Sequence, residues 1–200
     1  MSISPQDILF FWFGPSGDAV AMANRQSALW WSKDERIDAD MRERFETTVR
    51  TAADGHLDHW LSTAEGRLAL ILLADQFPHN IWRDTPAAFS LDPMARKLCK
   101  EGITNGDDRA LSPLQRVFFY LPLEHSEDVA DQALSVRKFR ELASEVEPAL
   151  MKTFAFFLTY ANRHESVIAR FGRFPHRNAI LGRDSTPEEL AYLAEPGSGF

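Results

Sequence analysis

The sequence predicts an all-α protein, and three observations support that prediction. A capping residue stands directly before proline five times, apolar residues recur at helical spacing between these points, and no segment alternates apolar and polar residues as a half-buried strand does. Proline is favourable at the first helical position because its missing N–H would be unpaired there, while the preceding side chain accepts from the free amides. We therefore expect an array of about eight to ten helices, with neighbouring helices stacked as hairpins.

The capping pairs set the start of several helices. They are Ser4-Pro5, Thr85-Pro86, Asp92-Pro93, Ser112-Pro113 and Thr186-Pro187. Two of them are reinforced three residues later by Gln115 and Glu189, and Ser62 with Glu65 forms the same capping box without proline. Together with the apolar spacing, these signals predict helices over about residues 5–13, 24–31, 37–55, 67–76, 93–104, 113–120, 127–145, 149–171 and 187–194.

Two of the predicted helices should be buried to different degrees. The helix from Ile37 carries its apolar residues on one stripe with charged residues opposite, which is typical of a surface helix. The segment from Arg67 to Gln76 is apolar on nearly all sides and should lie at the centre of the molecule. We expect Phe77-Pro78 to end it, because proline breaks a helix interior and disfavours helical geometry in the preceding residue.

Length and composition fit one domain that spans residues 1–200. The chain has 44% hydrophobic and 26% charged residues, which suffices for one well-filled core. Its single cysteine, Cys99, cannot form an internal disulfide, and the N-terminus lacks the features of a secretory signal. The longest apolar stretches fall far short of the roughly 18 to 20 residues that span a bilayer. These observations favour a cytoplasmic protein without a membrane span.

Charge is distributed unevenly along the chain. The net charge of −7 argues against nucleic acid or an anionic membrane as a partner. Residues 163–183 nevertheless contain five arginines and one acidic residue, a net charge of +4, which leaves −11 for the remainder. A basic cluster in an acidic protein indicates either an anion site or pairing with the protein's own carboxylates.

Three polar residues occupy positions where the helical pattern expects apolar ones: Asp75, Gln132 and His164. An unpaired buried polar group costs on the order of 1 to 3 kcal/mol, and a buried carboxylate costs more, so these side chains need partners. Either they satisfy one another and fix the packing, or they line one internal polar pocket together with the arginine-rich segment.

The segment from Glu124 to Glu127 puts two carboxylates and the His125 imidazole at the start of a predicted helix. This set suits acid–base chemistry or metal ligation. It equally suits an ordinary helix N-terminus, where the macrodipole favours acidic residues and Ser126 would be the cap. The second histidine of the zinc-protease helix is lacking, so we assign no metal site from the sequence.

The arginine-rich segment follows a long helix that Gly172 should end, because glycine tolerates the left-handed C-cap conformation. The turn after it displays four hydrogen-bond donors: Arg173, His176, Arg177 and Asn178. Guanidinium groups match phosphate or carboxylate bidentately, so this turn resembles an anion site. The alternative is a structural clamp in which the arginines pair with carboxylates of the same chain, namely Asp75, Asp92, Glu124 or Glu127.

Five motifs carry a family resemblance: Phe11-Trp-Phe-Gly14, Trp30-Trp31, Leu73-Ala-Asp-Gln-Phe-Pro-His-Asn80, Phe119-Tyr-Leu-Pro-Leu-Glu-His-Ser-Glu127 and Arg170-Phe-Gly-Arg-Phe-Pro-His-Arg-Asn178. From about residue 6 to the C-terminus, the chain resembles the bacterial domain-of-unknown-function family 924. The resemblance implies an all-α fold related to tetratricopeptide-like arrays and no established activity. An arginine stands in the family pattern where this chain has His79, which argues against a charge-based role there. The motifs imply a shared site at Asp75, Gln76, Asn80, Glu124, His125, Glu127, Arg173, His176, Arg177 and Asn178.

The leading hypothesis is an internal pocket that binds a small phosphate or carboxylate compound and, if the protein is an enzyme, acts by hydrolysis or group transfer. The candidate catalytic residues are the proton-transfer groups His125, His164 and His176, together with Glu124. Glu124 or Asp75 would orient the histidines. The candidate ligand-binding residues are Asp75, Gln76, Asn80, Glu127, Gln132, Arg173, Arg177 and Asn178. The sequence identifies neither a cofactor nor the oligomeric state.

Two other hypotheses come from different functional classes. A helical scaffold for a protein or peptide partner would use Trp30, Trp31 and Trp82 as anchors, although these rings equally suit the core. A metal hydrolase would use the Glu124–Glu127 segment, through its two glutamates and His125, and would carry stoichiometric metal.

Overall fold

The computed structural model describes residues 3–15 and 17–199, and every regular element within them is a helix. The α-helices are α1 (Pro5–Phe13), α2 (Ala19–Trp31), α3 (Glu35–Ala53), α4 (Ala64–Ala74), α5 (Gln76–Ile81), α6 (Asp92–Asn105), α7 (Pro113–Glu124), α8 (Val129–Glu145), α9 (Met151–Phe171) and α10 (Pro187–Leu193). Short 3-10 helices lie at Asp58–Ser62, Pro86–Phe89, Asp107–Ala110, Pro148–Leu150 and Pro175–Arg177. The predicted all-α class is confirmed, whereas tetratricopeptide-like stacking and a single domain stay predictions. None of the described helices is long and apolar enough to cross a membrane.

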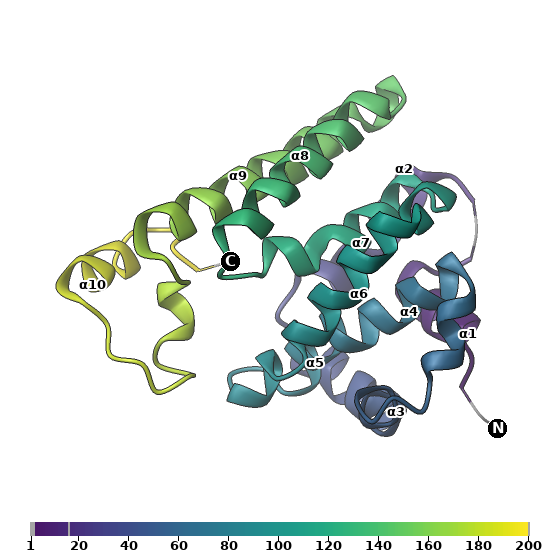
Figure 1. The fold of residues 1–200 in the computed structure, drawn as a ribbon, viewed down its shortest axis with the longest axis horizontal. Coiled ribbons are helices and arrows are strands. Elements are labelled where there is room, and N and C mark those ends of the chain that lie inside the picture. The colour runs from purple at the N-terminus through teal and green to yellow at the C-terminus, as the bar shows by residue number, and fades with distance from the viewer. Residues whose placement is uncertain (1–2, 16, 200) are drawn as a thin grey trace.

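Helix α4 lies at the centre of the fold, as its apolar sequence predicts. It packs against α1, α3, α6 and α7, and every residue from Gly66 to Ala74 is buried (Figure 1). The same core contains the rings of Trp12, Phe77 and Phe118; the Trp12 ring lies 5.7 Å from that of Phe77 and 5.4 Å from that of Phe118. Burial of apolar surface on every side of α4 is therefore what positions its C-terminal end, where Asp75 follows.

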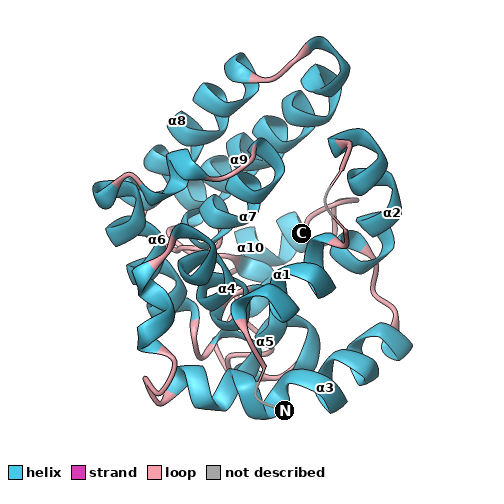
Figure 2. Ribbon diagram, turned by 90° about the vertical axis from the view of Figure 1, so that its right-hand side faces the viewer, coloured by secondary structure: helices cyan, strands magenta, loops and turns pink. Residues whose placement is uncertain are grey.

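Helices α8 and α9 form a long antiparallel pair that projects from this core (Figure 1), and Figure 2 shows the same pair from the side. Gly172 ends α9 in the left-handed conformation, with φ 68°, as predicted. The chain then folds back beside the end of α9, where a small second cluster forms from Val167, Ile168 and Phe174. This return brings the 3-10 helix at 175–177 toward the ends of α4 and α7.

The capping predictions are partly confirmed. Ser4, Ser112 and Thr186 are N-caps. Gln115 completes the capping box of Ser112, and Glu189 completes that of Thr186. The box predicted at Ser62 is wrong, because Thr63 is the N-cap of α4 and its hydroxyl accepts from the Gly66 amide at 3.0 Å. Asp92 is not a cap either. It is the first residue of α6, so its carboxylate remains available to partners far away in the sequence.

The predicted end of the central helix at Phe77-Pro78 is also wrong. Helix α4 ends at Ala74, the backbone bends at Asp75, and a new helix begins at Gln76. Pro78 is the third residue of α5, where the absent N–H costs no intrahelical hydrogen bond because the first-turn amides have no partner within the helix. The bend separates the two helices at the carboxylate that forms the centre of the site.

Helix α7 extends beyond its predicted end at about residue 120. Pro122 lies inside α7, which continues to Glu124, and His125 is the C-cap of that helix rather than part of the next helix start. Helix α8 begins later, with Asp128 rather than Ser126 as its N-cap. The segment from Glu124 to Glu127 therefore connects α7 to α8. Its side chains have different partners: Glu124 contacts His164, His125 contacts Asp75, and Glu127 contacts Arg183.

Candidate functional site

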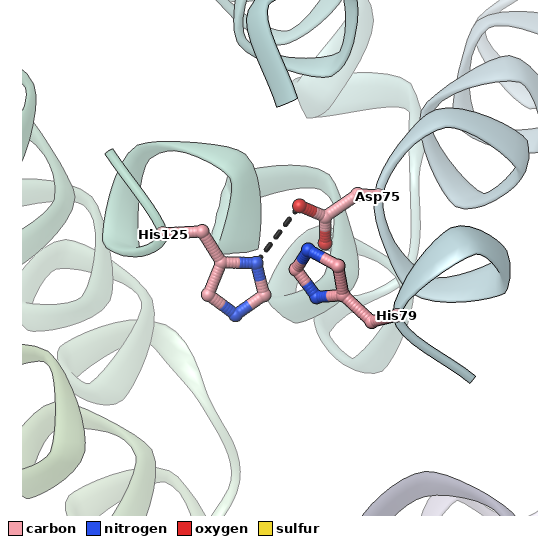
Figure 3. A group of neighbouring side chains, drawn as sticks. All are labelled: Asp75, His79 and His125. Carbon is pink, nitrogen blue, oxygen red and sulfur yellow. Dashed lines mark hydrogen bonds and ion pairs between the residues drawn. The ribbon is translucent and has the colours of Figure 1, made fainter. Parts of the chain in front are cut away.

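Asp75 and His125 meet where α4 and α7 end. The Asp75 carboxylate is fully buried, and its Oδ1 lies 2.8 Å from His125 Nδ1 (Figure 3). The His125 side chain is 17% exposed. Its Nε2 has no hydrogen-bond partner among the described residues and is not sealed from solvent. The pair thus combines a buried carboxylate with an imidazole that presents one nitrogen outward.

Neighbouring amides fix both members of the pair. Gln76 Nε2 donates to the second oxygen of Asp75 at 2.6 Å. Gln132 Nε2 donates to the main-chain oxygens of Glu124 at 2.6 Å and Ser126 at 2.7 Å, the residues on either side of His125. The predicted burial of Gln132 is confirmed, and its contacts hold the turn that carries His125.

The electrostatics of the pair favour its ionised form. Burial alone would raise the pKa of Asp75, but His125 and the hydrogen bond to it outweigh burial and hold that pKa below its ordinary value. Burial alone would lower the pKa of His125, but Asp75 raises it above its ordinary value. The two groups therefore stabilise each other's charge.

A second acid–base pair lies beside the first. Glu124 Oε1 is 3.1 Å from His164 Nδ1, which also lies 2.9 Å from the Tyr160 carbonyl oxygen. Burial raises the pKa of Glu124 to about 8 and lowers the pKa of His164 to about 3. Both groups are consequently neutral near pH 7, so their contact is not an ion pair.

Asp92 links a second histidine to the arginine-rich turn. Its Oδ1 lies 3.0 Å from His79 Nε2, and its Oδ2 accepts from Arg177 Nη1 at 3.1 Å. The rings of His79 and His125 are 5.0 Å apart, so this chain of contacts reaches the Asp75–His125 pair. The site is therefore assembled from α5, α6, α7 and the C-terminal turn.

Arg177 is the arginine that the fold brings into this cluster. It is 7% exposed, and its guanidinium lies over the rings of Phe89 and Phe174, at 4.5 and 4.8 Å from their centroids. Burial lowers its pKa from the ordinary arginine value. Its Nε is buried without a hydrogen-bond partner among the described residues. The Nε–H of Arg177 is therefore a hydrogen-bond donor without an acceptor among these residues.

One donor atom from each of Asp75, His79 and His125 lies within 4.8 Å of the others (Figure 3). Two imidazoles and a carboxylate are common ligands of divalent transition metals. The metal set considered from the sequence does not come together, because Glu124 pairs with His164 and Glu127 with Arg183.

The sequence and the fold are similar to those of proteins whose function is unknown. A family model described as bacterial protein of unknown function (DUF924) matches residues 8–197. The chain belongs to domain-of-unknown-function family 924. A solved protein of unknown function from Agrobacterium tumefaciens is 39% identical, with a TM-score of 0.80 over 95% of this chain and 96% of that chain. No curated protein matches. The resemblance predicted from the motifs is thus confirmed, and it supplies a fold without an activity.

In this family 924 chain, much of the arginine-rich segment is paired with carboxylates. Arg173 binds both oxygens of Glu189 at 2.6 and 2.8 Å, and Arg183 binds both oxygens of Glu127 at 2.7 and 2.9 Å. Asn178 joins Arg183 to the loop at Ser185. Two of the expected clamp partners are used, Glu127 by Arg183 and Asp92 by Arg177, whereas Glu189 was not among the expected partners. Arg177 therefore belongs both to the clamp and to the cluster around Asp75 and His125.

The other predicted residues lie near the cluster with separate contacts. Asn80 accepts from Arg83 at 3.3 Å. The His176 ring lies 5.6 Å from that of Phe174, and burial lowers the pKa of His176 to about 4. A surface hollow of about 460 Å³ lies elsewhere, between α9 and residues 192–198, and contains none of the predicted site residues.

His79 was not among the site residues expected from the sequence, and Asp92 was expected only as a possible partner of the arginines. His79 follows Asp75 by four residues, a spacing that puts two side chains on one helical face. That signal was available, although the helix break at Asp75 obscures it. No local signal shows that Asp92 joins His79 to Arg177, because these partners come from α5 and from a turn 85 residues later.

Proposed function

We propose that this family 924 protein binds a small anionic ligand, a phosphate or carboxylate compound, at Arg177 beside the Asp75–His125 pair. The observation that carries the proposal is the buried Nε of Arg177, which has no hydrogen-bond partner among the described residues. A buried donor without an acceptor costs about 1 to 3 kcal/mol, and an oxyanion would remove that cost. The neighbouring His125 adds a second donor to the same region, because its pKa is raised.

His125 is the proton-transfer group that we assign to this site when no cation is bound. Asp75 fixes its Nδ1, which leaves Nε2 for exchange of a proton with a ligand, as in other carboxylate-oriented imidazoles. Glu124 and His164 form the supporting neutral pair, and His176 lies beside them near Phe174. Hydrolysis or group transfer on the anionic compound is the reaction class that suits these groups.

A ligand screen with matched arginine variants tests the binding role. Thermal-shift measurements against inorganic phosphate, phosphorylated metabolites and di- and tricarboxylates should reveal a stabilising compound, whose affinity is then measured by calorimetry in the presence of a chelator. Arg177→Ala should weaken binding at least about tenfold, since charge-assisted hydrogen bonds are worth about 1.5 to 3 kcal/mol. Arg170→Ala is the control, because Arg170 pairs with Glu188 on the surface. Equal affinity in Arg177→Ala would reject the assignment.

A helical scaffold for a protein partner is the second candidate, and one observation favours it. Trp30 is buried, but Trp31 is 51% exposed and contacts Phe157, whose neighbour Phe156 is 55% exposed. Exposed aromatic side chains are frequent anchors at interfaces. A partner that co-purifies with the unaltered protein and is lost with Trp31→Ala and Phe156→Ala, while the anion screen yields nothing, would favour this function.

A further inference from the structure

We infer that Asp75, His79 and His125 form a binding site for one divalent transition-metal ion, Zn²⁺ or Fe²⁺. One donor atom from each residue lies within 4.8 Å of the others. Two donors held at about 2.0 to 2.2 Å by one tetrahedral ion are roughly 3.3 to 3.6 Å apart. The hydrogen-bonded 2.8 Å between Asp75 Oδ1 and His125 Nδ1 is shorter, so an ion would replace that hydrogen bond and move the two donors slightly apart. Small side-chain shifts would therefore bring the three donors around one ion.

The donor set determines which ions suit the site. Imidazole nitrogens favour zinc, iron and similar metals, whereas magnesium and calcium prefer sites made of oxygen ligands alone. Two histidines and one carboxylate leave coordination positions open, as in catalytic rather than structural sites. A ligand or water would occupy those positions.

Groups outside the donor set already orient the donors. Asp92 holds the His79 imidazole through a contact of 3.0 Å, and Gln76 donates to the Asp75 oxygen that does not face His125. Carboxylates and amides in such positions fix the orientation of metal ligands in other proteins. Asp75 is fully buried, whereas the side chains of His79 and His125 are 21% and 17% exposed, so an ion can enter from the side of the histidines.

This inference goes beyond the proposed function and changes the part played by His125. With an ion bound, His125 is a ligand instead of a proton-transfer group. Arg177 keeps its role, because it reaches the cluster through Asp92 and does not belong to the donor set. The ion would add positive charge beside Arg177, which suits the same anionic ligand.

The experiment uses the full-length protein stripped with chelator and then titrated with Zn²⁺ or Co²⁺ in the absence of any added anion. Calorimetry should give one equivalent of tightly bound ion, and Co²⁺ should produce the visible absorption of a low-symmetry nitrogen–oxygen site. His79→Ala should weaken the affinity by roughly 100-fold or more, and Asp92→Asn by roughly 10- to 100-fold. Circular dichroism confirms that each variant is folded.

His59→Ala is the matched control, because His59 lies exposed on the 3-10 helix at 58–62. It should bind the ion like the unaltered protein. No stoichiometric binding, or an affinity in folded His79→Ala equal to that of the unaltered protein, would overturn the site. The anion affinity is measured in the presence of chelator and depends on Arg177, whereas the metal affinity is measured without added anion and depends on His79. The anion-binding proposal and the metal-site proposal can therefore fail independently.

Discussion

Gln132 donates from Nε2 to the main-chain oxygen of Glu124 at 2.6 Å, and this bond ties α8 to the end of α7 directly before His125. The same nitrogen also reaches the Ser126 oxygen. One buried amide thereby satisfies main-chain acceptors at a helix end that has no glycine cap. The position of His125 consequently depends on a side chain seven residues away that never contacts it.

Replacing Gln132 with leucine should destabilise the fold as well as the site. The buried acceptors at Glu124 and Ser126 lose their donor, so the free energy of unfolding should fall by about 1 to 3 kcal/mol in urea titrations. Lys97→Ala, at an exposed position of α6, should change it by less than about 0.5 kcal/mol. An unchanged stability in the leucine variant would show that the amide contributes no net stabilisation.

Glu124→Gln should alter how stability depends on pH. The pKa of Glu124 is about 8 in the folded state, against an ordinary value of 4.5. Between pH 4.5 and pH 8 the folded protein therefore keeps this carboxyl protonated, and unfolding releases the proton. The unaltered protein should therefore lose up to about 1.4 kcal/mol of stability per pH unit from this group as the pH rises from 4.5 toward 8, and glutamine removes that loss.

Urea titrations at pH 5, 6.5 and 8 measure this effect. The free energy of unfolding of the glutamine variant, relative to that of the unaltered protein, should rise from pH 5 to pH 6.5 and again to pH 8. This difference should level off above pH 8. Glu101→Gln, at a half-exposed position, provides the baseline. Parallel stability curves for the Glu124 variant and the unaltered protein would contradict the neutral Glu124–His164 pair.

Glu189→Gln should weaken the clamp that docks the C-terminal segment. The hydrogen bond from Arg173 lowers the pKa of Glu189 to about 2 from an ordinary value of 4.5. The stability that this carboxylate contributes is therefore present above pH 4.5 and is lost as the pH falls toward 2. The melting temperature of the variant should be lower at pH 6 by roughly 2 to 4 °C for each kcal/mol lost.

The neighbouring residue supplies the control for this prediction. Glu188 also pairs with an arginine, Arg170, but its side chain is 63% exposed, and exposed ion pairs contribute little. Glu188→Gln should therefore melt close to the unaltered protein at pH 6. A Glu189 variant whose deficit persists undiminished at pH 3 would show that the ionised pair is not the cause.

Local chemistry explains why most of the helices were predictable. Thr186 with Glu189, and Gly172 at the end of α9, act through neighbours within a few residues, so the sequence contains their partners. Burial of Asp75 and His164 was likewise predictable, because helical phase places them on apolar faces. The expected helix end at Phe77-Pro78 was wrong, since the absent N–H of a proline costs no hydrogen bond in the first turn of a helix.

The site itself depends on contacts that no local pattern contains. Asp92 appeared in the sequence as a helix cap and as one of four possible partners of the arginines, and the fold makes it the group that joins His79 to Arg177. Arg173 and Arg177 were equivalent donors in the sequence, and only the fold separates them: Arg173 meets Glu189 on the segment that follows, while Arg177 enters the aromatic surroundings of Phe89. Tertiary packing therefore decides which arginine enters the cluster around Asp92.

The ion pair between Asp92 and Arg177 closes a loop of 85 residues. Loop closure over such a distance is slow relative to helix formation, so this contact should be among the last to form during folding. During synthesis, His79, His125 and both aspartates are made well before Arg177. The nascent chain can therefore build its core and the Asp75–His125 pair first and form the Asp92–Arg177 contact only later.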